Sequence, residues 1–176
     1  MAEAFSNKIT RAAGIVTTSS SGSIGITTTI ITGISTVGVA VSDLVDNANF
    51  IAGTKVTGYG AAASQVVVDQ TSTNTAAVSG TAIVNFLGMT TAYTSAAATK
   101  SILIGGTFAN NTSSSVNLTV EIHDASAGIQ AALASKIPVP TGSSFVISDA
   151  GKTVLEATDE VRVFCDTANA LDVNLS

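Results

Sequence analysis

The chain has 176 residues, of which only 11% are charged, and its formal net charge at pH 7 is -5. Serine and threonine together account for 46 residues and alanine for 27, whereas histidine and cysteine occur once each and tryptophan is absent. Such a composition leaves few side chains for acid–base, nucleophilic or metal chemistry. The acidic balance also argues against nucleic-acid binding, which needs clustered Lys and Arg. A structural or binding protein is therefore favoured over an enzyme.

Residues 1–22 are predicted to form an extended N-terminal arm that ends in a Ser/Thr-rich linker. The apolar residues after Lys8 and Arg11 are interrupted by the polar run 17–21, so no signal peptide is expected. The charge-free stretch 24–41 has the length of a membrane span, but its threonines and glycines favour two strands instead. We expect the arm to lie on a neighbouring subunit, because alone it cannot bury enough surface to offset its ordering entropy.

Residues 23–75 are predicted to form a smaller β module. The apolar runs in this part are short and β-branched, and Asn, Asp and Gly separate them as turn residues do. The expected strands are 23–32, 37–41, 55–59 and 65–69.

Residues 76–176 are predicted to form an antiparallel β-sandwich, jelly-roll-like, of about eight strands. Aromatic residues are scarce, and thin layers of Val, Ile, Leu and Ala suit two packed sheets. The polar stretch 90–99 is expected to be a connecting loop, and the two prolines in 137–140 indicate an edge segment or a crossover. The expected strands are 76–87, 100–108, 116–124, 128–133, 145–148, 153–156, 161–166 and 171–175.

Apolar and polar side chains alternate along the expected strand around Leu118. The alternation places Leu118 and Val120 in the core. It places Thr119 and Glu121 on the opposite face, where we expect them to meet solvent. Cys165 is in phase with two neighbouring valines and is expected to be a small buried residue.

No residue is predicted to be catalytic, cofactor-binding or metal-binding. His123 and Asp124 are adjacent, but the chain has no second histidine, and no cysteine or carboxylate cluster lies at ligand spacing. A hydrogen-bonding role at the end of a strand is the favoured interpretation of His123. Because Cys165 is the only cysteine, a disulfide framework and a thiolate metal site are excluded, and a nucleophilic role is not favoured.

Two pairs of carboxylates are candidates for acid–base catalysis or calcium binding. Asp159 and Glu160 precede an expected strand, and Asp43 and Asp46 flank two apolar residues. Neither pair has the dense spacing of oxygen ligands that a calcium loop needs. Turn and strand-capping roles are the favoured interpretation of both pairs.

Several segments of the C-terminal half together resemble small virion proteins of tailed bacteriophages, particularly those of cyanophages. They are Val116–Asp124, Ile137–Phe145, Leu155–Val163 and Thr167–Val173. The similarity covers about residues 100–175 and is carried by turns and strands that determine the fold, not by active-site residues. The stretch Gly38–Val68 also resembles a short β module of phage virion and fibre proteins.

The resemblance implies a non-enzymatic structural component of a phage particle. We expect a capsid decoration (cement) protein that binds and braces the major-capsid shell, forms a homo-oligomer, with a trimer favoured, and is assembled into the virion in the host cytoplasm. No cofactor, nucleic acid or membrane is expected as a partner. A neck, collar or tail component is the alternative, and a fibre-associated receptor- or glycan-binding module would have to use Tyr59 and Tyr93.

Overall fold

The computed structural model describes residues 5–176, and of residues 149–151 it describes only the backbone. The described residues form antiparallel β-sheets and contain no helix, which confirms the all-β, sandwich-like fold class. No helix long and apolar enough to cross a membrane was found in this part of the chain.

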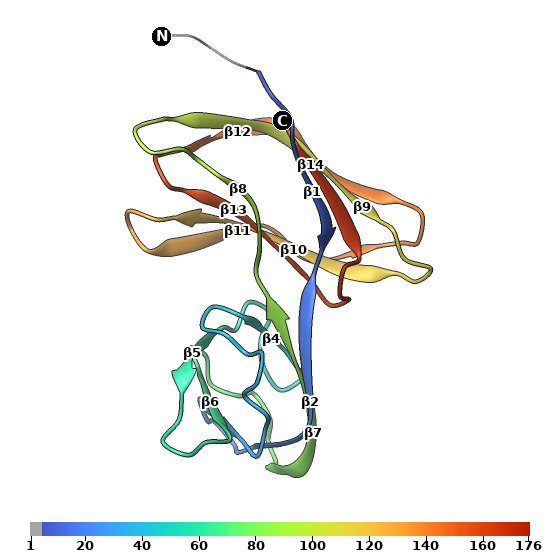
Figure 1. Cartoon of the computed structure of the whole chain (residues 1–176). Coiled ribbons are helices and arrows are strands. Elements are labelled where there is room, and N and C mark those ends of the chain that lie inside the picture. Colours follow the sequence, from blue (N-terminus) through green and yellow to red (C-terminus); the bar gives the residue numbers. More distant parts are fainter. Residues whose placement is uncertain (1–4) are drawn as a thin grey trace. The chain divides into compact units, whose positions relative to one another are not determined.

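The chain divides into two compact units (Figure 1). The first, here called the sandwich unit, contains the described residues 5–14 and 90–176. The second, here called the barrel unit, consists of residues 15–89 and is inserted between the first two strands of the sandwich unit. The predicted boundaries at 22 and 75 therefore differ from the observed ones. The local sequence pattern indicates which segments form strands. It does not indicate which strands pair with one another, and this pairing defines the units.

The sandwich unit contains eight strands in two four-stranded sheets. Sheet I has the order β1-β14-β9-β12, and sheet II has the order β11-β10-β13-β8. The strands are β1 (Lys8–Ala13), β8 (Thr90–Thr94), β9 (Ser101–Asn110), β10 (Val116–Asp124), β11 (Ile129–Val139), β12 (Ser144–Leu155), β13 (Glu160–Cys165) and β14 (Leu171–Leu175).

The order of these strands is that of a jelly roll. The pairs β1–β14, β8–β13, β9–β12 and β10–β11 are those of one long hairpin that folds back between β10 and β11. When this hairpin folds back, β9 also pairs with β14, and β10 also pairs with β13. These two pairings complete the two four-stranded sheets. This double-sheet arrangement matches the predicted jelly-roll-like sandwich.

Apolar side chains from both sheets form the core of the sandwich unit. Leu118, Val120 and Cys165 are fully buried there, as the alternation predicts. Thr119 and Glu121 do face away from this core, but they are only 6% and 5% exposed, so the expectation that they meet solvent is wrong. Periodicity identifies the two faces of a strand, but it does not show whether other segments cover the second face.

The predicted N-terminal arm is instead part of the chain's own two units. β1 pairs with β14, at the far end of the sequence, and the amide of Ala12 donates a 3.1 Å hydrogen bond to Asp172 Oδ1. Residues 15–24 form β2 and pair with β7 in the barrel unit. The stretch 90–94, expected to be a loop, is strand β8. In each case a partner distant in sequence supplies the pairing that orders a polar segment.

The barrel unit is a six-stranded antiparallel sheet with the order β4-β7-β2-β3-β6-β5. Its edge strands meet, because Leu44 forms a bridge with Lys55 and the amide of Val45 donates to Thr54 O at 2.8 Å. The sheet thereby closes around a core that includes Ile31 and Phe86. The strands are β2 (Ile15–Ile24), β3 (Ile30–Thr32), β4 (Leu44–Asp46), β5 (Val56–Tyr59), β6 (Gln65–Val68) and β7 (Val78–Gly88).

Candidate functional site

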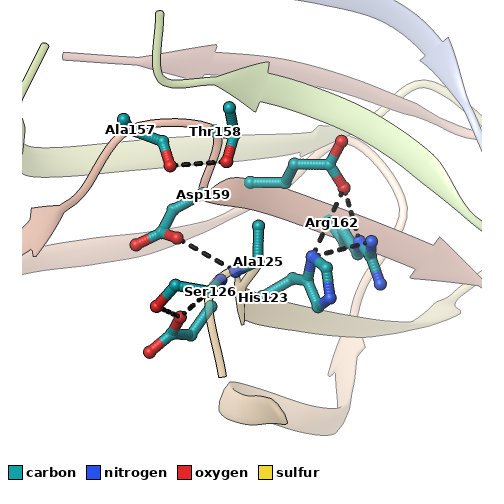
Figure 2. Close-up of polar contacts among 9 residues, drawn as sticks. His123, Ala125, Ser126, Ala157, Thr158, Asp159 and Arg162 are labelled. Atoms are coloured by element: carbon teal, nitrogen blue, oxygen red, sulfur yellow. Dashed lines mark hydrogen bonds and ion pairs between the residues drawn. The ribbon is translucent and has the colours of Figure 1, made fainter. Parts of the chain in front are cut away.

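Four of the titratable residues singled out in the sequence lie close together in the sandwich unit (Figure 2). β10 and β13 are antiparallel neighbours in sheet II, and their register places His123 directly opposite Glu160. Asp124 is the last residue of β10, and Asp159 directly precedes β13. The adjacent pairs His123–Asp124 and Asp159–Glu160 therefore share one end of sheet II. This cluster is the first candidate for a functional site.

His123, Glu160 and Arg162 form a hydrogen-bonded triplet. Arg162 Nε donates a 2.7 Å bond to Glu160 Oε2, and Arg162 Nη2 lies 2.9 Å from His123 Nδ1. Because a guanidinium group can only donate, Nδ1 must accept, which assigns the ring proton to Nε2. The lone pair that a general base would use is thus occupied by Arg162. Glu160 neutralises the nearly buried guanidinium group of Arg162, and the contact between Arg162 and His123 joins β13 to β10. His123 thus has the strand-end hydrogen-bonding role that the sequence predicts.

Asp159 is only 4% exposed and uses both carboxylate oxygens to accept backbone hydrogen bonds. Oδ1 accepts from the amide of Ala125 at 3.0 Å, and Oδ2 accepts from the amide of Glu156 at 2.9 Å. Its own carbonyl accepts from the amide of Ser95 at 2.8 Å. Asp159 therefore ties together the end of β8, the β10–β11 turn and the β12–β13 turn, so its role is structural.

Asp124 holds the tight turn that follows β10. Its Oδ1 accepts hydrogen bonds from the amides of Ser126 and Ala127, each at 2.9 Å, and from Ser126 Oγ at 2.7 Å. The backbone bond from Ala127, followed by the hydroxyl of Ser126, lowers the pKa of this carboxyl. Asp124 is thus an ionised turn residue. Among the side chains that the structure describes, those of residues 5–148 and 152–176, no group of three or more His, Cys, Asp or Glu could hold a metal ion.

Cys165 is buried in the core of the sandwich unit, and burial raises the pKa of its thiol to about 11. Its Sγ lies 3.9 Å from Asp166 Oδ1. Since the thiolate is the reactive form of cysteine, a buried thiol with a raised pKa is a poor nucleophile. The structure therefore agrees with the packing role predicted for this residue.

In the barrel unit, Asp43 lines a small pocket of about 240 Å³, whose other lining residues carry no titratable side chain. Desolvation raises the pKa of Asp43, and a 2.8 Å hydrogen bond from the amide of Ala40 opposes that shift. Asp46, the second member of this predicted pair, does not line the pocket. A single carboxylate without a second titratable partner in the pocket does not form an acid–base pair.

The two tyrosines considered for glycan binding belong to different units. Tyr59 belongs to the barrel unit, and its hydroxyl donates to the carbonyl oxygen of Val39 at 2.5 Å. Tyr93 belongs to the sandwich unit, and its hydroxyl lies 2.7 Å from Ser101 Oγ. Each hydroxyl is thus engaged within its own unit, while Tyr59 remains 52% exposed.

A set of exposed apolar side chains on the outer face of sheet I is a candidate contact surface that sequence reasoning missed. Five large aliphatic side chains on strands β1, β9 and β12 are 38% to 66% exposed. Ile102 and Val154 are directly opposite each other in the β9–β12 register. The run of three consecutive apolar residues at 102–104 was the signal that could have revealed this face, because successive side chains of a strand point to opposite faces. The five are Ile9, Ile102, Ile104, Val146 and Val154.

Comparison of the chain with protein families, with curated proteins and with solved structures found no match. The likeness to phage virion proteins therefore stays a prediction from the sequence segments quoted above. Three features of the structure do not depend on this likeness. They are the jelly-roll topology, the structural roles of the titratable residues and the apolar outer face of sheet I.

Proposed function

We propose that the chain is a non-enzymatic structural subunit of a tailed-bacteriophage particle, and that it decorates and braces the major-capsid shell. The observation that carries the proposal is the outer face of sheet I, where exposed Ile and Val side chains lie on three of the four strands. Large exposed apolar patches on small proteins are typical of surfaces that bind a partner.

Two further observations support an assembly role. The titratable residues that could have served catalysis are engaged in strand pairing, turns and the core, as described for His123, Asp159 and Cys165. The jelly roll is also an architecture on which viral capsid proteins are built. Since a fold alone does not determine function, this second point supports the proposal only together with the surface and the sequence likeness.

The proposed mode of attachment is apolar contact repeated over many copies. Only 11% of the residues are charged, so long-range attraction contributes little. Multivalent binding turns weak single contacts into lasting attachment. We expect a homo-oligomer, with a trimer favoured, whose copies bind the major capsid protein. Salt should weaken the attachment only slightly, because few charge pairs are available to be screened.

The copy number in purified particles tests the proposal. A shell decoration protein should be present in hundreds of copies, whereas a neck, collar or tail component would be present in about a dozen or fewer. Deleting the gene should give shells that assemble but burst at a lower temperature. Intact, heat-resistant heads without necks or tails would overturn the decoration role and support the alternative.

A variant of the apolar face makes the test specific. Ile102→Ser and Val154→Ser together should reduce the copies bound per shell, since they remove a directly opposed apolar pair from the proposed contact surface. The matched control is Ile129→Ser, which removes an exposed isoleucine (62%) from β11 in the other sheet. Equal occupancy by both variants and the unaltered protein would contradict attachment through sheet I.

A further inference from the structure

The pocket that Asp43 lines belongs entirely to the barrel unit. Its volume of about 240 Å³ is below the roughly 300–1,000 Å³ of pockets for drug-sized ligands, so it suits a single side chain. Asp43 is the titratable residue among those that line it, and the rest of the wall is apolar side chains and glycine. These other lining residues are Ile15, Gly38, Ala40, Val41, Gly88 and Met89.

A four-residue turn, 40–43, holds the Asp43 carboxylate at this pocket. The amide of Asp43 donates a 3.2 Å bond to Ala40 O, and the amide of Ala40 donates a 2.8 Å bond to Asp43 Oδ2. Ser42, the third residue of the turn, has a φ of +77°, a conformation that glycine usually supplies at this position. Val56 at the start of β5 accepts a 2.8 Å bond from the Ser42 amide and donates a 2.9 Å bond to Asp43 O. These bonds fix the position of the carboxylate.

Asp43 is a buried carboxylate whose charge is not balanced by a neighbouring cation. The residue is only 4% exposed. Two causes act on its pKa, namely burial, which raises it, and the hydrogen bond from Ala40, which lowers it. Neither cause is the charge of a Lys, Arg or His side chain. Buried charges in proteins are normally paired, because an uncompensated one is costly. A cation that enters the pocket therefore stabilises the ionised form of Asp43.

The shape and chemistry of the pocket favour an ammonium group on an aliphatic stem. Ile15 and Val41 are 51% and 55% exposed, and such apolar side chains can cover the methylene groups of a lysine. Bidentate pairing with arginine uses both carboxylate oxygens, but Asp43 Oδ2 already accepts from the Ala40 amide. The point charge of an ammonium group needs only one oxygen. A calcium ion takes about six to eight oxygen ligands, which one carboxylate in an apolar wall does not supply.

We propose that this pocket binds a lysine side chain of a partner protein, with the ammonium group on the Asp43 carboxylate and the methylene groups against Ile15 and Val41. The net charge of -5 favours the approach of a basic partner surface. Binding energy at interfaces often concentrates in small desolvated pockets that one side chain fills. This inference goes beyond the proposed function. It concerns the barrel unit and not the outer face of sheet I, so either can fail without the other.

The test titrates the whole chain with small lysine analogues and follows the backbone amide signals by NMR at pH 7 and low salt. The first probe is Nα-acetyl-lysine N-methylamide, which should give saturable shifts at the amides of Ala40 and Asp43. The norleucine analogue has the same backbone and a similar stem but no charge, and it should bind about tenfold more weakly. The arginine analogue should also bind more weakly than the lysine analogue. Equal binding of the lysine and norleucine analogues would contradict the proposal.

Two variants with the same change in net charge make the test specific. Asp43→Asn keeps the shape of the side chain but removes its charge, so it should weaken binding of the lysine analogue about tenfold. The matched control is Asp69→Asn, on an exposed residue of the same unit that does not line the pocket, and it should leave binding within about twofold. Ala40→Leu keeps the carboxylate but fills the pocket, so it should also weaken binding. Equal binding by all three variants would overturn the proposal.

Two further measurements identify the source of the ammonium group. If the pocket serves a lysine of a protein, the blocked lysine analogue should bind at least as tightly as n-butylammonium, which has a similar stem but no backbone. Binding of n-butylammonium alone would overturn the proposal, because the pocket would then select a free amine. Sedimentation of the unaltered chain should show no self-association that Asp43→Asn abolishes. Such self-association would also overturn the proposal, because a lysine of a second copy would then be the occupant.

Discussion

Removing the Asp159 carboxylate should destabilise the sandwich unit more than any other change of a single polar side chain at the candidate site. In Asp159→Ala, the amides of Ala125 and Glu156 lose their acceptor at a position that is only 4% exposed. Hydrogen bonds to a charged group contribute about 1.5–3 kcal/mol each, so the free energy of unfolding should fall by about 3–5 kcal/mol. Asp159→Asn keeps one acceptor oxygen but points an NH2 group at the second amide, so it should lose at least half as much.

Urea unfolding followed by tyrosine fluorescence can assign this loss to one unit. The chain has no tryptophan and two tyrosines, of which Tyr93 lies in the sandwich unit and Tyr59 in the barrel unit. In Tyr59→Phe protein, the remaining signal reports the sandwich unit, and Asp159→Ala should lower its unfolding midpoint. In Tyr93→Phe protein, the signal reports the barrel unit, and its midpoint should not change.

Asp124→Ala is the control for the Asp159 variant. Asp124 also accepts several hydrogen bonds, but they lie within one exposed turn, where water can replace them. Its effect on the sandwich transition should therefore be much smaller than that of Asp159→Ala. If both variants shift the midpoint equally, or if Asp159→Ala shifts only the barrel transition, the connecting role assigned to Asp159 is wrong.

Three more predictions concern packing, backbone geometry and pH. Leu118→Ala should cost about 2–5 kcal/mol through loss of core packing. Thr119→Ala should cost about 0.5–1.5 kcal/mol, because it removes the hydroxyl that accepts the 3.0 Å hydrogen bond from the partly buried Lys136 amide; equal stability of Thr119→Ala and the unaltered protein in urea titrations would contradict this second value. Gly14→Ala places a Cβ 2.4 Å from a backbone carbonyl oxygen at a φ of +120°, so its melting temperature should fall well below that of Gly142→Ala, which has a φ of +65° and open space around it. Because burial raises the pKa of Asp43, its ionised form opposes folding. Asp43→Asn should therefore gain stability relative to the unaltered protein as pH rises from 3.8 through the folded pKa, and a urea midpoint difference that does not change between pH 3 and 8 would refute this.

Local sequence pattern was sufficient to predict much of the sandwich unit. The predicted strands 116–124 and 171–175 coincide with β10 and β14, because alternation there is regular and turn residues bound both segments. The sequence predicted an edge segment or a crossover at 137–140, and Pro138 does lie in β11 at the edge of sheet II, whereas Pro140 follows that strand. These features depend on neighbours in the sequence, which is what a periodicity argument can read.

Pairing between distant segments could not be predicted in the same way. β1 is a polar six-residue segment whose partner, β14, starts about 160 positions later, and no periodicity connects the two. The same limit applies to the candidate site. Asp159 was assigned to a turn, but its contacts with Ser95 and Ala125 depend on the jelly-roll pairing of β8, β10 and β13. The apolar face of sheet I was missed because it arises only when β1, β9 and β12 are placed in one layer.

The insertion of the barrel unit leads to a last prediction, that the sandwich unit folds without it. All eight strands of sheets I and II come from residues outside 15–89. The two ends of the insertion are adjacent, since the amide of Gly14 donates a 3.3 Å hydrogen bond to Thr90 Oγ1.

Replacing residues 15–89 with a short Gly/Ser linker should therefore leave the jelly-roll pairing intact, and the shorter connection also lowers the entropy lost on closing it. The shortened protein should unfold cooperatively in urea, with a midpoint close to that of the Tyr93 signal in the full chain. Its amide NMR spectrum should overlay that of the full chain for sheet II. A shortened protein that is compact but lacks a cooperative transition would show that the barrel unit stabilises the sandwich beyond joining β1 to β8. The two units would then have to be treated as one folding unit, despite their separate cores.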